Sequence, residues 1–97
     1  MFRHVVLLKY RPDATVEQKA AVQEGLARLP AAIPLIRNYV YGPDAGVAEG
    51  NYDLAVVADF DSRTDYLAYQ AHPAHVDFMH RCVRPIMESR VAVQYEW

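Results

Sequence analysis

Residues 66–80, YLAYQAHPAHVDFMH, gather the side chains of this chain that could perform chemistry. The stretch holds three of the four histidines, two tyrosines and a proline. A neutral imidazole can remove a proton from a carbon next to a carbonyl, and a tyrosine hydroxyl can donate a hydrogen bond to the oxygen that becomes negative. Histidines on one helix can also bind a metal ion. A purely structural corner between two helices would use the same residues.

The proline sets the expected geometry of this stretch. Pro73 suits the first turn of a helix, so His75 is predicted to lie in that first turn, where the helix dipole disfavours an added proton. We therefore expect His75 to be neutral at pH 7. His72 could cap the helix, and His80, five residues after His75, is predicted to face solvent. For Tyr66 and Tyr69 we expect one packed and one half-exposed side chain.

Metal binding and cysteine chemistry are less favoured hypotheses for this chain. His72 and His75 are three residues apart and His4 could add a third nitrogen, but the proline restricts their convergence and no carboxylate accompanies them. The single cysteine, Cys82, excludes an intrachain disulfide and suits a small apolar role in a helix, with the neighbouring Arg84 facing solvent. We expect no metal and no cofactor.

The elements that must position these side chains follow the order β-α-β-β-α-β within one domain over 1–97. Thr15 and Gln18 form a capping-box pattern, and Pro30 is expected to end the first helix. This order fits a ferredoxin-like α+β sandwich, with helices on one face of a four-stranded antiparallel sheet. The predicted strands are 3–10, 36–42, 52–60 and 90–97, and the predicted helices are 16–29, 63–71 and 73–84.

The first and third strands are apolar on both faces. Residues 4, 6, 8 and 10 share one face of the first strand, whereas Val5 and Leu7 lie on the other. Helices can cover only one face, and at roughly 25 cal/mol per Å² the uncovered side chains would forgo several kcal/mol of burial. We therefore predict a homodimer through the open sheet face. The alternative is a monomer whose open face is kept polar by Arg3, Lys9 and alanines.

Composition excludes several classes of protein. The chain has 97 residues, 53% hydrophobic residues and a net charge of −2 with interspersed signs, which argues against a nucleic-acid groove or a basic membrane patch. No apolar run approaches the roughly 18 residues of a membrane span. With one cysteine and no signal-like opening, the expected location is the cytoplasm.

Four segments carry a resemblance to a known family. HVVLLKYRPDAT, a central IP, GNYDLAVVADFDS and AYQAHPAH occur in the order found in the stress-responsive α/β-barrel (Dabb) family, from residue 4 to 95. The resemblance implies dimeric α/β barrels built from ferredoxin-like subunits. Members include a plant polyketide cyclase that makes olivetolic acid, as well as proteins of unassigned role, so the fold alone does not choose a function.

The resemblance also implies a site. By similarity to the plant cyclase, His75 would be the base, Tyr69 would donate a hydrogen bond to a carbonyl or enolate, and His4 would orient or support them. Leu26 stands where the cyclase has a pocket tyrosine, which makes this pocket more apolar and implies a different molecule. The further residues expected to line the pocket are His72, Val6, Leu8, Leu26 and Phe78.

Three functions follow from these observations. The first is a cofactor-independent, polyketide cyclase-like lyase or isomerase that transfers a proton on a polyketide-like or phenolic compound, with His75 as base. The second is a protein that binds or carries a small molecule in the same cavity without chemistry. The third is a stress-associated structural dimer. An open cavity beside His75 favours the first two, and a sealed core favours the third.

Overall fold

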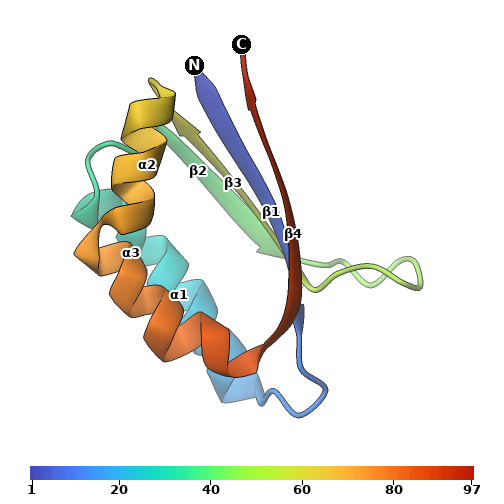
Figure 1. Cartoon of the computed structure of the whole chain (residues 1–97). Coiled ribbons are helices and arrows are strands. Elements are labelled where there is room, and N and C mark those ends of the chain that lie inside the picture. The colour runs from blue at the N-terminus through green and yellow to red at the C-terminus, as the bar shows by residue number, and fades with distance from the viewer.

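The computed structural model describes all residues from 1 to 97 as three helices and short helical turns packed on one face of a four-stranded sheet (Figure 1). The strands are antiparallel throughout, in the order β2-β3-β1-β4, so the predicted ferredoxin-like fold is confirmed. No helix combines the length and apolar character needed to cross a membrane. The elements are β1 (Phe2–Tyr10), α1 (Val16–Ala32), β2 (Asn38–Pro43), β3 (Leu54–Phe60), α2 (Arg63–Ala71), α3 (Pro73–Phe78), the π-helical turn η1 (Met79–Val83), the 3-10 turn η2 (Arg84–Ile86) and β4 (Met87–Glu96).

Local sequence explains where the helices begin. The hydroxyl of Thr15 accepts a hydrogen bond from the backbone N–H of Gln18, whose side chain accepts from the backbone N–H of Thr15. This is the predicted capping box. Ser62 caps α2 by accepting from the backbone N–H of Asp65.

The end of the first helix was predicted too early. Helix α1 continues through Pro30 to Ala32. A proline removes one backbone donor, but here it lies in the last turn, and the backbone N–H of Ile33 still donates to the carbonyl of Leu29 at 2.9 Å. Ile33 is fully buried, so packing holds the extra turn in place.

Other helix and strand boundaries also differ from the predicted ones. Strands β2 and β3 begin two residues later than predicted, at Asn38 and Leu54. The helix predicted over 73–84 is regular only to Phe78, then widens into η1 and tightens into η2 around Pro85. Strand β4 therefore begins at Met87, three residues earlier than predicted.

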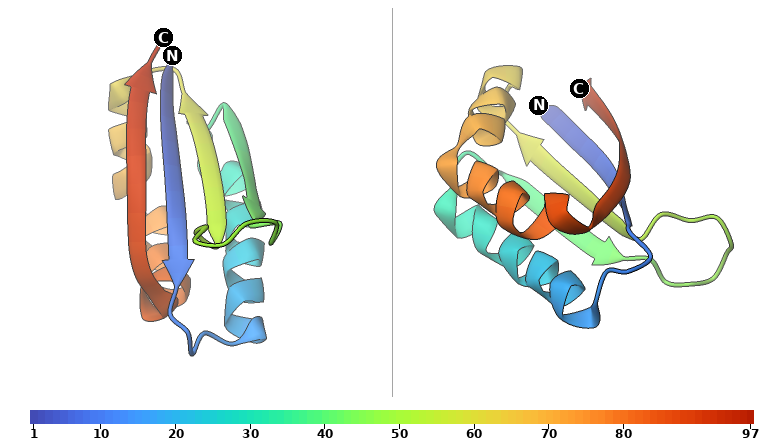
Figure 2. Two further views of the ribbon diagram at one scale, coloured as in Figure 1. Left: turned by 90° about the vertical axis from the view of Figure 1, so that its right-hand side faces the viewer. Right: turned by 60° about the horizontal axis from the view of Figure 1, so that its bottom comes forward.

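The helices lie side by side over one face of the sheet (Figure 2), and the hydrophobic core fills the layer between sheet and helices. Helices α1 and α3 approach closely at Gly25, where an added Cβ would collide with the ring of Phe78. The glycine thus fixes the position of α3, which carries His75, over the sheet. Buried core residues of the sheet and of α1 include Val6, Leu8, Val22, Leu26, Leu29, Leu54, Val56 and Phe60.

The outer face is the side of the sheet that the helices leave uncovered. Strand pairing aligns four valines across it, Val40, Val57, Val5 and Val93. A second row follows with Gly42, Ala55, Leu7 and Val91. Several of these side chains are exposed, among them Leu7, Val40, Val91 and Val93. The outer face therefore presents a continuous apolar centre to solvent in the single chain.

Candidate functional site

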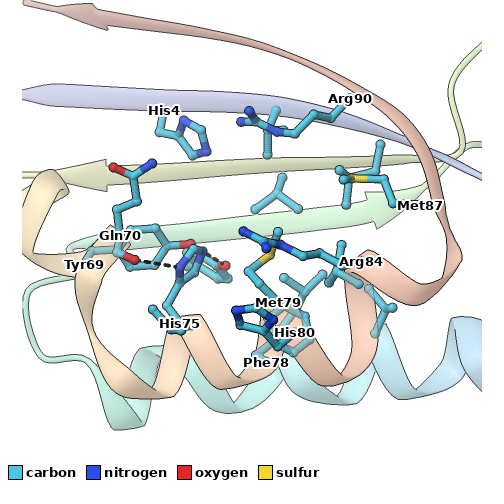
Figure 3. A pocket seen from close by; sticks show the side chains of 18 of the residues that line it. His4, Tyr69, Gln70, His75, Phe78, Met79, His80, Arg84, Met87 and Arg90 are labelled. Carbon is cyan, nitrogen blue, oxygen red and sulfur yellow. Dashed lines mark hydrogen bonds between the residues drawn. The ribbon is translucent and has the colours of Figure 1, made fainter.

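A cavity of about 260 Å³ lies between the inner face of the sheet and the helices (Figure 3). His4, Tyr69 and His75 all line it, as do four of the predicted apolar residues, Val6, Leu8, Leu26 and Phe78. The structure thus brings residues from β1, α2 and α3 to one hollow. Other lining residues are Val22, Tyr39, Val56, Tyr66, Gln70, Val76, Met79, His80, Val83, Arg84, Met87 and Arg90.

His75 is oriented by the end of the preceding helix. Its Nδ1 lies 3.2 Å from the backbone carbonyl oxygen of Gln70, and the ring packs against Tyr69 with 4.5 Å between centroids. A carbonyl oxygen can only accept, so Nδ1 carries the proton of the neutral ring. The lone pair is therefore on Nε2, which has no partner in the protein. This is the arrangement that a general base needs.

Burial is the largest cause of the neutral state expected for His75. Burial lowers the pKa of His75 below its usual 6.5, and the positive charge of Arg90 lowers it further, against an opposing effect of the bond to Gln70. Desolvation and a neighbouring guanidinium keep the proton off this ring.

His4 takes the opposite tautomer. The side-chain amide nitrogen of Gln94 lies 2.9 Å from Nδ1 of His4, and an amide nitrogen can only donate. Nδ1 of His4 is therefore the acceptor, and the proton of the neutral ring is on Nε2. Burial, together with the charge of Arg90, lowers the pKa of His4 to about 4. The site thus contains one imidazole with a free lone pair and another with an N–H donor.

Tyr69 is buried and its hydroxyl lies 3.2 Å from the hydroxyl of Tyr39 on β2. Burial raises the pKa of Tyr69 far above its usual value and that of Tyr39 to about 12, so both stay protonated. Because each hydroxyl can both donate and accept, Tyr69 can accept a hydrogen bond from Tyr39 and donate one into the cavity.

Tyr66 corrects another prediction. We expected one of Tyr66 and Tyr69 to be half-exposed, but both are buried. The ring of Tyr66 stacks on Phe2 at 4.9 Å and contacts His4 at 5.0 Å between centroids. The inner face of β1 therefore holds the second tyrosine, which the spacing along α2 alone did not reveal.

His72 does not line the cavity, contrary to the prediction. Its Nδ1 accepts a hydrogen bond from the backbone N–H of Ala74 at 3.1 Å and so caps α3. This use of the ring turns it toward the backbone of the corner, three residues before His75. His80 is exposed at the edge of the cavity. No group of three or more histidine, cysteine, aspartate or glutamate side chains is arranged to hold a metal ion.

Two arginines belong to the cavity and were missed. Arg84 in η2 was expected in solvent, and it is exposed, but it borders the cavity together with Arg90 of β4. Arg90 pairs with the buried Leu8 across the sheet, and residues directly opposite one another share a face. Alternation along β4 could have found Arg90 once its register with β1 was known.

Residues 2–97 match the family model of the stress responsive A/B barrel domain. The chain belongs to this family. Its A/B barrel domain is 26% identical over 80 residues to a stress-response A/B barrel domain-containing protein of Arabidopsis thaliana, covering 79% of this chain and 69% of the relative.

Solved structures agree with this assignment. A dimeric ferredoxin-like protein of unknown function from Thermobifida fusca superimposes with a TM-score of 0.91 at 43% identity, covering 99% of this chain and 90% of the other. A hydroxynitrile lyase from Passiflora edulis superimposes with a TM-score of 0.84 at 21% identity, covering 97% and 90%. The second likeness shows the fold alone.

Proposed function

We propose that this A/B barrel domain protein forms a homodimer through its outer face and binds a small molecule in the cavity, where His75 moves a proton on a polyketide-like or phenolic compound. The observation that carries the proposal is the pair of imidazoles with opposite tautomers on one cavity. His75 offers a lone pair at Nε2, and His4 offers an N–H donor at Nε2.

The chemistry follows from this pair. Nε2 of His75 takes a proton from a carbon next to a carbonyl, and the electron pair left on that carbon moves onto the carbonyl oxygen to give an enolate. The N–H of His4 and the hydroxyl of Tyr69 donate hydrogen bonds to this oxygen. In an isomerisation His75 returns the proton at another carbon. In a cyclisation the enolate carbon attacks a second carbonyl, whose oxygen takes the proton back.

The homodimer rests on the outer face. Burial of its two apolar rows would contribute hydrophobic free energy that the single chain forgoes, and large apolar patches usually mark interfaces. The similar Thermobifida fusca protein is described as dimeric. Face-to-face packing of two sheets would leave each helical layer, and each cavity, on the outside of the pair.

The experiment follows deuterium exchange at the benzylic carbon of phenylacetone, a neutral one-ring ketone, by proton NMR in D₂O. We expect the wild type to accelerate the exchange and His75→Gln to lose about 10²–10⁴-fold of that acceleration, because general-base catalysis contributes this much. The matched control is His72→Asn, which removes the other imidazole of the corner but keeps an acceptor for the cap. Circular dichroism establishes that each variant is folded.

The outcomes separate the candidate functions. Equal exchange rates for the wild type and His75→Gln contradict the role of His75. Binding of phenylacetone, seen as shifts of its NMR signals, without acceleration by the wild type supports the second candidate, a ligand-binding protein. That candidate is favoured by one observation, since the hydroxyl of Tyr69 already has a partner in Tyr39.

A further inference from the structure

Arg84 and Arg90 are free cations on opposite walls of the cavity. Five of the eight arginines form ion pairs with carboxylates, and Arg84 and Arg90 are two of the three that do not. Arg84 extends from the helical layer and Arg90 from the sheet, and both reach into the space between them (Figure 3). Two guanidinium groups that converge without a counter-charge repel each other.

The charge of the lining is one-sided. The chain has 12 acidic residues and a net charge of −2, yet none of the 19 residues that line the cavity is aspartate or glutamate. The charge of Arg90 also reaches the interior, because it lowers the pKa of His4, His75 and Tyr66. A molecule that enters this cavity therefore meets positive charge in an otherwise acidic protein.

We propose that the ligand of this cavity is an organic anion, with a carboxylate held between Arg84 and Arg90 and a small apolar body in the hollow beside them. Guanidinium groups bind carboxylates through paired, charge-assisted hydrogen bonds. Thirteen of the lining residues are hydrophobic, and Met79 and Met87 beside the arginines can adapt to the shape of the body.

The cavity also limits the size and direction of this ligand. A volume of 260 Å³ corresponds to about nine waters at ~30 Å³ each, which suits one ring with a short chain. The guanidinium groups of Arg84 and Arg90 point toward the part of the cavity that His4, Tyr69 and His75 line (Figure 3). A carboxylate between the arginines would therefore hold the adjacent part of the molecule beside the imidazoles. The inference rests on the proposed function for its reactive end, but not for binding.

The test measures binding of hydrocinnamate and of the neutral hydrocinnamyl alcohol by isothermal titration calorimetry. The two probes share the ring and chain and differ in the charged group. We expect the wild type to bind hydrocinnamate about ten- to a hundredfold more tightly, as hydrogen bonds to charged groups allow. Arg84→Gln and Arg90→Gln are each expected to weaken the binding of hydrocinnamate by about tenfold and to leave the affinity for the alcohol unchanged. Added salt reduces the preference.

The control is Arg81→Gln. Arg81 lies three residues before Arg84, pairs with Asp77 on the outside and does not line the cavity, so its loss leaves both affinities unchanged. Acetate serves as the carboxylate without a body and is expected to bind weakly. The proposal is overturned if the alcohol binds as tightly as hydrocinnamate, if the Arg84 and Arg90 variants keep the preference, if acetate binds equally well, or if hydrocinnamate does not bind at millimolar concentration.

Failure of this inference differs from failure of the proposed catalysis. If exchange of neutral phenylacetone depends on His75 but the protein shows no preference for hydrocinnamate over the alcohol, only the inference of an anionic ligand fails. If the preference for hydrocinnamate depends on the arginines but exchange is not accelerated, only the proposed catalysis fails. The protein is then one that binds organic anions.

Discussion

The two faces of the sheet have different characters, although adjacent residues of the same strands supply them. On the inner face one row across the sheet reads Tyr39, Ala58, His4 and Gln94, whereas the next row on the outer face reads Val40, Val57, Val5 and Val93. The polar side chains of the inner row have hydrogen-bond partners, and two of them, Tyr39 and His4, border the cavity. The outer row is apolar and lacks any cover in the single chain.

The difference teaches how a chain of 97 residues can support two tasks with one sheet. Because successive side chains of a strand point to opposite faces, each strand supplies one set of side chains to the cavity side and another to the outer face. A polar row flanks the valines, where Arg3 forms a two-point ion pair with Asp59 at 2.7 and 2.8 Å. In the proposed homodimer this ion pair would lie beside the valines.

The sharpest way to break the comparison is to place the same charge on each face of β1. Val6 on the inner face is 8% exposed, so Val6→Asp buries a carboxylate without a partner and should cost at least about 4 kcal/mol of stability. Val5→Asp, one residue earlier on the outer face, should leave the fold intact and weaken dimerisation by at least about a hundredfold, because each dimer contains the charge twice. Urea unfolding measures the first effect and analytical ultracentrifugation the second.

The matched control for charge is Val47→Asp, at an 86% exposed valine of the β2–β3 loop, which should change neither quantity. Val93→Lys, on the exposed edge strand, repeats the outer-face test with a milder change if Val5→Asp unfolds. A wild type that sediments as an 11.0 kDa monomer, or an undiminished dimer of both outer-face variants, would contradict the assignment of the outer face.

Most of the fold could be predicted because it depends on local patterns. Alternation of side chains predicted the faces of β1, and the capping-box pattern predicted the start of α1. The errors arose where packing outweighs local preference. Pro30 stays in its helix because the buried Ile33 holds the next turn, and the widened turn η1 has no signal in residues 79–83.

The site was predictable in its centre and not at its edges. His4, Tyr69 and His75 line the cavity as expected, because alternation along β1 places His4 on the inner face and the family pattern indicates all three. Arg84 and Arg90 were missed because their place depends on the register of β4 and on how η2 turns, which are properties of the whole fold. Their roles in chemistry and binding stay predictions.

A pH titration sharpens the inner face. The pKa of His4 is lowered to about 4 from 6.5, so the unfolded chain binds a proton that the folded protein does not. Stability is therefore complete above pH 6.5 and falls by about 2–3 kcal/mol as the pH drops to 4. His75 adds to the loss in the same direction. Urea unfolding at fixed protein concentration across this range measures it.

His4→Phe isolates the contribution of His4. It keeps an aromatic ring beside Tyr66 and removes the titrating group, so its stability should fall less steeply between pH 6.5 and 4. The ion-paired Asp59 and Asp61 have pKa values lowered from 3.8, so their stabilising contribution begins to fall near the acidic end of this range, but equally in both proteins, and it cancels in the comparison. Parallel pH profiles for the wild type and His4→Phe would show that burial of His4 carries no such cost.

The smallest expected change in stability concerns His72, at the corner between α2 and α3. His72→Ala removes the acceptor for the backbone N–H of Ala74 and should cost about 1 kcal/mol, whereas His72→Asn should restore most of it. Because the corner is remote from the valines of the outer face, dimerisation should be the same in both variants. Thermal unfolding and sedimentation of the two variants measure this directly. A loss of dimer in His72→Ala would mean that the two faces are coupled through the helical layer, and the separation of tasks between them would fail.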